Sequence, residues 1–154
     1  MRIRGGFTIV ELLIVIGILV IICGIVVSAF TKFNRVESVN KDTETVLETL
    51  RLARNQTLAA KNDTQYGVRF ASSSVILFSG ASYVPGAASN QTYFLHAGDT
   101  VLSLQFVGAT SSILFQRLTG AAASYGTATI SSKTTSSSDS VIISSTGRIA
   151  GPTL

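Results

Sequence analysis

Residues 12–30 read LLIVIGILVIICGIVVSAF, nineteen residues in which no side chain is charged. As an α-helix that rises about 1.5 Å per residue, this stretch covers about 28 Å, which is enough to cross the hydrocarbon core of a bilayer. The basic residues before it are Arg2 and Arg4, and basic residues favour the cytoplasmic side of a membrane. We therefore expect one transmembrane helix, an N-terminus in the cytoplasm and an extracytoplasmic C-terminal part.

The charged residues divide the chain of 154 residues into three segments. Residues 7–30 contain one charge, Glu11, whereas residues 31–62 contain ten and residues 63–154 contain seven. A chain of this length provides one folded domain beside the membrane segment. Without Arg2 and Arg4 the balance is 10 basic to 8 acidic residues, which does not indicate a surface for binding polyanions.

The sequence around Glu11, MRIRGGFTIVELLIVIGIL at residues 1–19, resembles the N-terminus of type IV pilins and type II secretion pseudopilins. The resemblance implies a leader peptide at residues 1–6, cleavage by prepilin peptidase between Gly6 and Phe7, and N-methylation of Phe7. It also implies that Glu11, the fifth residue of the mature chain, is an assembly residue. The implied location is the inner (cytoplasmic) membrane, and then a pilus or pseudopilus filament.

The position of Glu11 also has a physical interpretation. A carboxylate inside an apolar helix is costly unless it has a cationic partner. The α-amine of a chain that begins at Phe7 lies about 6 Å from Glu11 along the helix axis. That amine can belong to the same chain, or to a neighbour whose helix is shifted, in which case Glu11 sets the register of assembly.

Two glycines, Gly17 and Gly24, lie inside the same apolar segment. Each costs up to about 1 kcal/mol relative to alanine in a helix interior. We expect them to mark positions where the helix loosens when subunits leave the bilayer and pack together. The alternative is that small residues allow close packing of helices.

Residues 31–62 have the period of an amphipathic helix, and no proline interrupts it. The apolar stripe consists of Phe33, Val36, Val39, Val46, Leu47, Leu50 and Leu58, with Thr43 and Ala53 in its gaps. Glu37 with Lys41 and Glu48 with Arg51 are expected to form ion pairs on the surface. The simplest prediction is one helix from about Phe7 to about Lys61, ended by Asn62 and Asp63.

Residues 63–154 predict strands, because short apolar runs alternate with glycine and serine clusters, and 29 of these 92 residues are Ser or Thr. The expected strands cover residues 65–70, 74–78, 92–95, 101–107, 112–115, 127–131 and 141–144, and residues 134–140 are expected to form a loop. The apolar stripe of the helix must be buried against another layer of the fold. We therefore predict an α+β fold: one long N-terminal helix, transmembrane over 7–30 and amphipathic over 31–62, packed against an antiparallel β-domain at 63–154.

Four further segments resemble the minor pseudopilin GspH and FimT group. They are LRLARNQTLAAKN at 50–62, ILFQRLTG at 113–120, GTATIS at 126–131 and VIISSTGRI at 141–149. The resemblance implies a structural subunit, a minor pseudopilin or minor pilin, of a type II secretion pseudopilus or a type IV pilus. Its implied partners are prepilin peptidase, other pilin or pseudopilin subunits, the inner-membrane assembly platform and membrane lipid. The sequence does not separate the two machines.

The sequence predicts no catalytic site, cofactor or metal. The one histidine, His96, and the one cysteine, Cys23, lie in different segments, and His96 is expected at the end of a strand. No pattern of paired carboxylates, metal ligands or a phosphate-binding glycine loop is found. We therefore do not expect an enzyme.

Two other functions stay open. DNA-binding FimT-like proteins carry a Gly-Arg-x-Arg turn, whereas the turn here reads Gly147-Arg148-Ile149-Ala150 and lacks the second arginine. Because phosphate contacts dominate DNA affinity, binding through Arg148 is kept as an alternative, and nucleic acid is not the expected partner. The other alternative is a secreted β-protein that is cleaved after Ala29.

Overall fold

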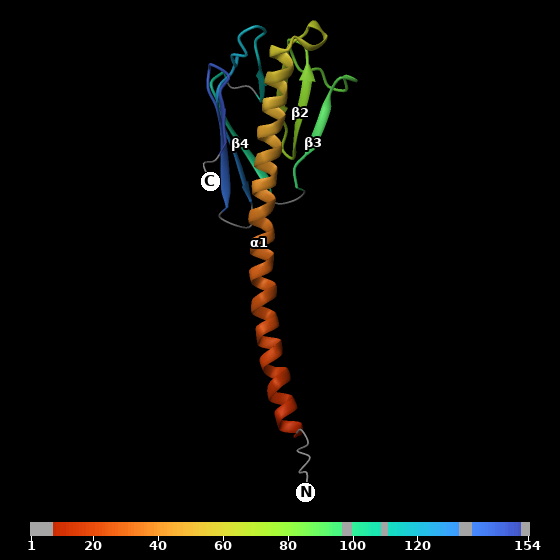
Figure 1. Cartoon of the computed structure of the whole chain (residues 1–154), viewed down its shortest axis with the longest axis vertical. Helices are drawn as coiled ribbons and strands as arrows, with labels where there is room; N and C mark the ends of the chain where they lie inside the picture. Colours follow the sequence, from red (N-terminus) through yellow and green to blue (C-terminus); the bar gives the residue numbers. More distant parts are fainter. Residues whose placement is uncertain (1–7, 97–99, 109–110, 133–136, 152–154) are drawn as a thin grey trace. The chain divides into compact units, whose positions relative to one another are not determined.

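The computed structural model describes residues 8–96, 100–108, 111–132 and 137–151. Contacts within the chain define two compact units, Met1–Asn34, called here the anchor unit, and Arg35–Leu154, called the body unit. One long N-terminal helix is followed by strands that form antiparallel sheets, so the predicted α+β class is confirmed (Figure 1).

The helix α1 spans Ile9–Leu58 and continues without a break through Gly17 and Gly24. After Leu58 the backbone of Ala60 is left-handed (φ 47°), and a 3-10 turn, η1, follows at Lys61–Asp63. The helix therefore ends before the predicted Lys61, because Ala60 leaves the helical conformation first. The predicted start at Phe7 lies outside the described residues.

One face of α1 is buried in the body unit. Its buried residues are Val39, Asp42, Thr43, Val46, Thr49, Leu50, Ala53 and Thr57. The hydroxyl groups of Thr43, Thr49 and Thr57 donate to the carbonyl oxygen four residues earlier, at 2.7 to 2.8 Å. These hydroxyls are therefore buried without losing a hydrogen bond.

The predicted apolar stripe of this helix segment is only partly buried. Its central residues are in the core, but Phe33, Val36 and Leu58 are 66%, 41% and 41% exposed. The buried face begins at Val39 and ends at Thr57, and these three residues lie beyond it. The 3.6-residue period thus continues past the part of the helix that the body unit covers.

The first sheet contains four antiparallel strands in the order β3-β2-β1-β5. Their bounds are β1 Tyr66–Phe70, β2 Ser74–Ser79, β3 Gln91–Phe94 and β5 Ser112–Leu114. All four strands were expected, and each predicted end lies within one residue of the observed end.

The second sheet is also antiparallel, in the order β4-β6-β7-β8. Its strands are β4 Thr100–Phe106, β6 Gly126–Ser132, β7 Ser138–Ile143 and β8 Ile149–Ala150. The prediction of a loop over residues 134–140 is wrong for residues 138–140, because these pair with residues 129–131 of β6. Residues 134–136 lie outside the described chain. Strand β8 was not expected, since two residues show no alternation.

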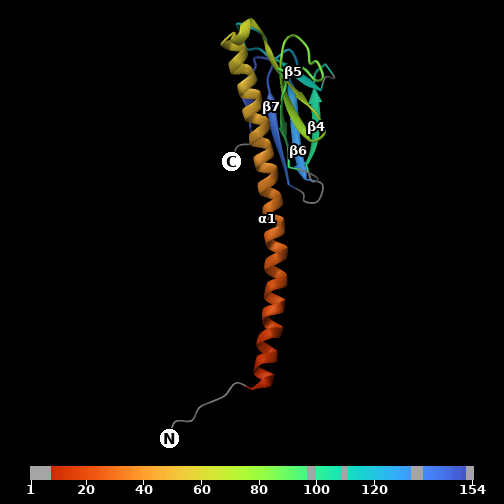
Figure 2. The ribbon, with the colours of Figure 1, turned by 90° about the vertical axis from the view of Figure 1, so that its right-hand side faces the viewer.

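The helix and both sheets share one hydrophobic core in the body unit. Among its fully buried side chains are Val39, Val46 and Leu50 from α1, Val68, Val75, Leu77 and Ile113 from the first sheet, and Ile130, Val141 and Ile143 from the second. Figure 2 shows this part of α1 along one side of the sheets. Its opposite face, with Glu44, Glu48 and Arg51, is exposed.

Candidate functional site

Glu11 lies in the first turn of α1, and Thr8 caps the start of this helix. The backbone N–H of Glu11 donates to the Thr8 hydroxyl oxygen at 3.2 Å, and the N–H of Leu12 donates to the Thr8 carbonyl oxygen at 3.2 Å. Thr8 and Glu11 have the spacing of a capping box, and the helix dipole favours a carboxylate here. This contact is local, and the assembly role of Glu11 stays a prediction. Gly6 and Phe7 lie outside the described residues.

The surface of α1 around and beyond Glu11 is apolar on every side. Each large hydrophobic side chain among residues 9–30 is exposed, from 46% for Val15 to 80% for Ile9. By length and composition this part of the helix can span a membrane. A helix that is apolar all round has no face suited to water.

Gly17 and Gly24 are both helical, and a Cβ added at either would meet no atom within 4 Å. Gly24 lines a shallow depression of the helix surface, whose other lining residues are Val20, Ile21, Ile25, Ser28, Ala29 and Lys32. Small residues with this spacing allow the close approach of a second helix. Loosening and close packing at the two glycines both stay predictions.

A buried carboxylate, Asp42, joins α1 to the segment after β3. Its side chain is 2% exposed, and its two oxygens accept hydrogen bonds from the backbone N–H of His96 at 3.0 and 3.1 Å. The Nδ1 atom of His96 lies 2.7 Å from Asp42 Oδ1. We call this contact the Asp42–His96 clamp. His96 lies two residues after the end of β3 at Phe94, near the strand end where it was expected, but its partner 54 residues earlier carries no local sequence signal.

Arg148 lies exposed in the turn between β7 and β8. Its backbone N–H donates to the Ser144 hydroxyl oxygen at 3.1 Å, and its carbonyl oxygen accepts the N–H of Ser144 at 2.9 Å. The structure places two helix arginines beside it, around one surface depression of about 340 Å³. The residues that line this depression are Arg51, Arg54, Asn55, Arg148 and Ile149. Arg51, Arg54 and Arg148 are called here the arginine cluster, which the sequence analysis does not predict.

Within the described ranges, no group of three His, Cys, Asp or Glu side chains is placed to hold a metal ion. No family model, curated protein or solved structure matches the chain. The function is therefore inferred from the residues and from their geometry.

Proposed function

We propose that this chain is a structural subunit, a minor pilin or minor pseudopilin, of a type IV pilus or a type II secretion pseudopilus. Prepilin peptidase cuts it between Gly6 and Phe7, Phe7 is methylated, and the subunit assembles through α1. Before assembly α1 lies in the inner membrane, where it contacts lipid and the assembly platform. In the filament, the helices of other pilin or pseudopilin subunits replace the lipid.

The observation that carries this proposal is the apolar surface of α1 on every side, next to one carboxylate in its first turn. A membrane anchor needs the apolar surface, but a carboxylate makes insertion more costly. In a filament the carboxylate has a use, because it selects one position along the helix for a neighbour's amine. The resemblance of residues 1–19 to the pilin N-terminus adds support from the sequence.

The secreted alternative, with cleavage after Ala29, has less support. Helix α1 is continuous across Ala29, and its exposed apolar surface extends past this site to Phe30 and Phe33. A cut there would leave both phenylalanines in water near a new N-terminus. A subunit that keeps the whole helix avoids this cost.

The intact mass of the protein purified from membranes tests the proposal. We expect a mature chain that begins at Phe7 and carries one methyl group. Gly6→Val should leave a precursor in the membrane, because a branched side chain replaces the small residue at the cut. A mature chain that begins at Phe30, or one that retains Met1, would contradict the proposal. Neighbouring genes for a secretion channel or for a retraction ATPase then separate the two machines.

DNA binding, as in a minor pilin for DNA uptake, is the second candidate function. The arginine cluster favours it, because three arginine residues line one depression and arginine side chains can contact phosphates. However, residues 35–154 contain nine basic and seven acidic residues, which leaves little net positive charge to attract a nucleic acid.

A further inference from the structure

Strand β4 is an open edge of the second sheet. It has seven residues and pairs with β6 on one side, and no described strand pairs with its other side. The other edge strands, β3, β5 and β8, have four, three and two residues. A long edge without charge or proline can pair with another chain, and the sequence of β4, TVLSLQF, contains neither. Among the described strands β4 is therefore best suited to accept a further strand.

The main-chain groups of every second residue of β4 point away from β6. The N–H of Val107 donates to the carbonyl oxygen of Tyr125 at 2.9 Å, and these two residues continue the register of β4 and β6. Because hydrogen-bonded positions alternate in an antiparallel pair, Leu102, Leu104 and Phe106 direct their N–H and C=O groups outward. Within the described chain no hydrogen bond uses these groups. One edge thus offers donors and acceptors at regular spacing.

The hydrophobic core is open beside this edge. Leu102 and Leu104 pack against the core but are only half-buried, whereas their partners on β6, Ile130 and Ala128, are fully buried. The two leucines form one wall of a surface depression of about 390 Å³, which is called here the β4 slot. Apolar surface therefore lies directly beside the free hydrogen-bonding groups of β4.

The opposite wall of the β4 slot belongs to the first sheet and its turns. It consists of residues 69–72 and Ser111. The N–H of Phe70 donates to the carbonyl oxygen of Ser111 at 2.8 Å, which holds the two parts of this wall together. The rings of Phe70 and Phe106, with centroids 5.4 Å apart, join the wall to β4. The slot is thus bounded by this chain on both sides.

We propose that the β4 edge binds an extended segment of a different protein, which adds to the second sheet as an antiparallel strand. The main chain of the segment pairs with Leu102, Leu104 and Phe106, and every second side chain enters the β4 slot. Neighbouring strands lie about 4.8 Å apart, so a second copy that paired through its own β4 would bring its β6 against the wall at residues 69–72. A single extended segment has no such neighbour.

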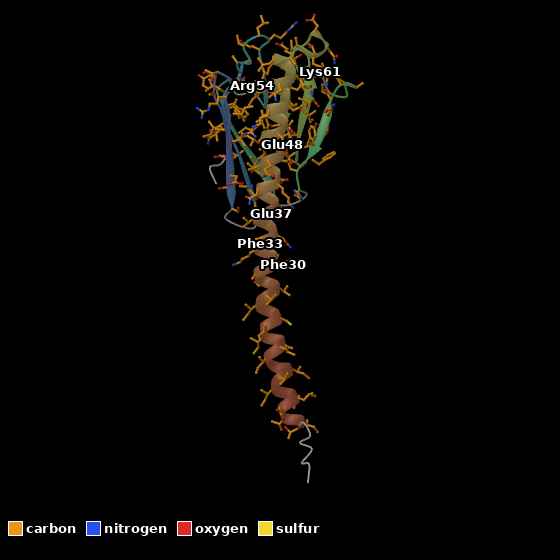
Figure 3. The ribbon with its side chains drawn as sticks, viewed as in Figure 1. Phe30, Phe33, Glu37, Glu48, Arg54 and Lys61 are labelled. Carbon is orange, nitrogen blue, oxygen red and sulfur yellow. The ribbon has the colours of Figure 1, made fainter. Side chains whose placement is uncertain are left out.

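Most charged side chains of the helix lie away from the β4 slot. Figure 2 shows β4 on the side of the body unit away from α1. Figure 3 labels Glu37, Glu48 and Arg54 on α1, and none of them lines the slot. Glu37 pairs with Lys41 at 3.7 Å, whereas the predicted Glu48–Arg51 ion pair does not form. These charges therefore do not select the segment that binds β4.

The charge of the β4 slot itself comes from Arg69. No other described residue that lines the slot is charged, and the Arg69 guanidinium lies over the ring of Tyr83 at 4.9 Å. An acidic residue beside the slot is therefore favourable, and a basic one is not. We expect a segment with apolar side chains at every second position and with no lysine or arginine.

A synthetic peptide tests this inference on the full-length protein in detergent. The peptide is Glu-Val-Thr-Val-Thr-Val-Glu, blocked at both ends and labelled with a fluorophore, and fluorescence anisotropy measures its affinity. Two further peptides carry N-methyl groups on the valines or on the threonines. With the valines in the β4 slot, an antiparallel segment donates its valine N–H groups to β4, and its threonine N–H groups point to solvent.

We expect saturable binding of the unmethylated and the threonine-methylated peptides. The valine-methylated peptide should bind at least about tenfold more weakly, because it lacks three hydrogen bonds to β4. Bound peptide should also slow hydrogen exchange at the amides of Leu102, Leu104 and Phe106.

Three protein variants locate the binding site. Leu104→Lys places an ammonium group in the β4 slot, and Ala71→Trp fills the slot from the opposite wall without changing β4. Both should weaken binding of the unmethylated peptide at least about tenfold. Ser103→Lys is the matched control, because Ser103 is exposed and its side chain lies on the other face of β4. Circular dichroism verifies the fold of each variant, and Ala71→Trp keeps the test decisive if Leu104→Lys does not fold.

The inference is overturned by the absence of saturable binding, by equal affinity of the two methylated peptides, or by unchanged affinity in Ala71→Trp. Exchange at the same amides that slows with rising protein concentration, without peptide, overturns it in favour of a second copy. The intact mass of the same preparation tests the proposed function separately. A chain that begins at Phe7 and binds no peptide refutes the β4 site alone, whereas an uncut chain that binds the peptide refutes the proposed function alone.

Discussion

At the scale of single residues, Glu11 has one observed interaction, through its backbone N–H, and one proposed interaction, through its carboxylate. It occupies the third position of a helix whose start is capped by Thr8, at 3.2 Å from the hydroxyl oxygen to its own N–H. A capping box accepts glutamate or glutamine at this position, whereas attraction to an α-amine requires the negative charge. Substitutions can therefore separate the two roles.

We expect Glu11→Gln and Glu11→Val both to insert into the membrane and both to stay out of filaments, because each removes the charge. Thr8→Ala is the matched control, since it weakens the helix start by about 1 kcal/mol and keeps the carboxylate. Fractionation into membranes and sheared filaments measures the outcome. If the Gln variant entered filaments normally while the Val variant did not, capping would be the role that matters.

The Asp42–His96 clamp gives a second prediction for single residues. Asp42→Ala leaves the His96 backbone N–H without its carboxylate and should lower the free energy of unfolding by about 1–3 kcal/mol. His96→Ala keeps the backbone N–H and should cost about 0.5–1.5 kcal/mol. Denaturant unfolding of the full chain in detergent, followed by circular dichroism, compares the two. If Asp42→Ala lowered the free energy of unfolding no more than His96→Ala does, the hydrogen bonds from the His96 backbone N–H to Asp42 would add little stability.

At the scale of elements, the sequence predicted those helices and strands that have a clear local pattern of apolar side chains. Strand β2, SVILFS at Ser74–Ser79, is an apolar run and was found almost to the residue. Strand β7 begins with the polar residues 138–140, which resemble a loop until β6 is placed beside them. Its start is therefore decided by the neighbouring strand, which no local pattern reports.

The turn before β8 gives a prediction at this scale, because Gly147 and Gly86 have nearly equal positive φ values, 77° and 75°. A Cβ at Gly86 would meet nothing within 4 Å, whereas one at Gly147 would collide with the Gly120 carbonyl. Gly86→Ala should destabilise the body unit by about 1 kcal/mol from backbone strain alone. Gly147→Ala should cost more than about 2 kcal/mol, because the turn must also shift away from Gly120 and Arg54. Chemical denaturation measures the free energy of unfolding of both variants. Equal losses would mean that the close approach of Gly147 to the Gly120 carbonyl is not required for stability.

At the scale of the whole molecule, the sites depend on pairs that are remote in the chain. Asp42 and His96 are 54 residues apart, and Arg51 and Arg148 are 97 apart. The sequence shows that these side chains exist, but only the packing of α1 on the sheets gives them their partners. For this reason the residues of the anchor unit could be proposed from sequence, whereas the clamp and the arginine cluster could not.

The division into two units predicts how the chain behaves when it is cut. Every buried hydrophobic residue in the described part lies between Val39 and Ile143, inside the body unit. A fragment of residues 35–154 should therefore fold and remain monodisperse without detergent, whereas the full chain should require it. Size-exclusion chromatography and circular dichroism test both. A fragment that aggregates or lacks a β-sheet spectrum would show that the body unit needs the anchor unit for its stability.

The burial of one helix face also determines how the body unit responds to mechanical load. A pull applied to α1 at Arg35, along the helix axis, acts on the buried side chains from Val39 to Thr57 at the same time, because they all slide against the sheets together. The Asp42–His96 clamp lies near the pulled end and links the helix to the segment after β3. We therefore expect it to bear part of the applied force as soon as the pull begins. The buried Asp42 carboxylate therefore resists mechanical extraction of the helix, and we expect its effect to be greatest when the force acts along the helix axis.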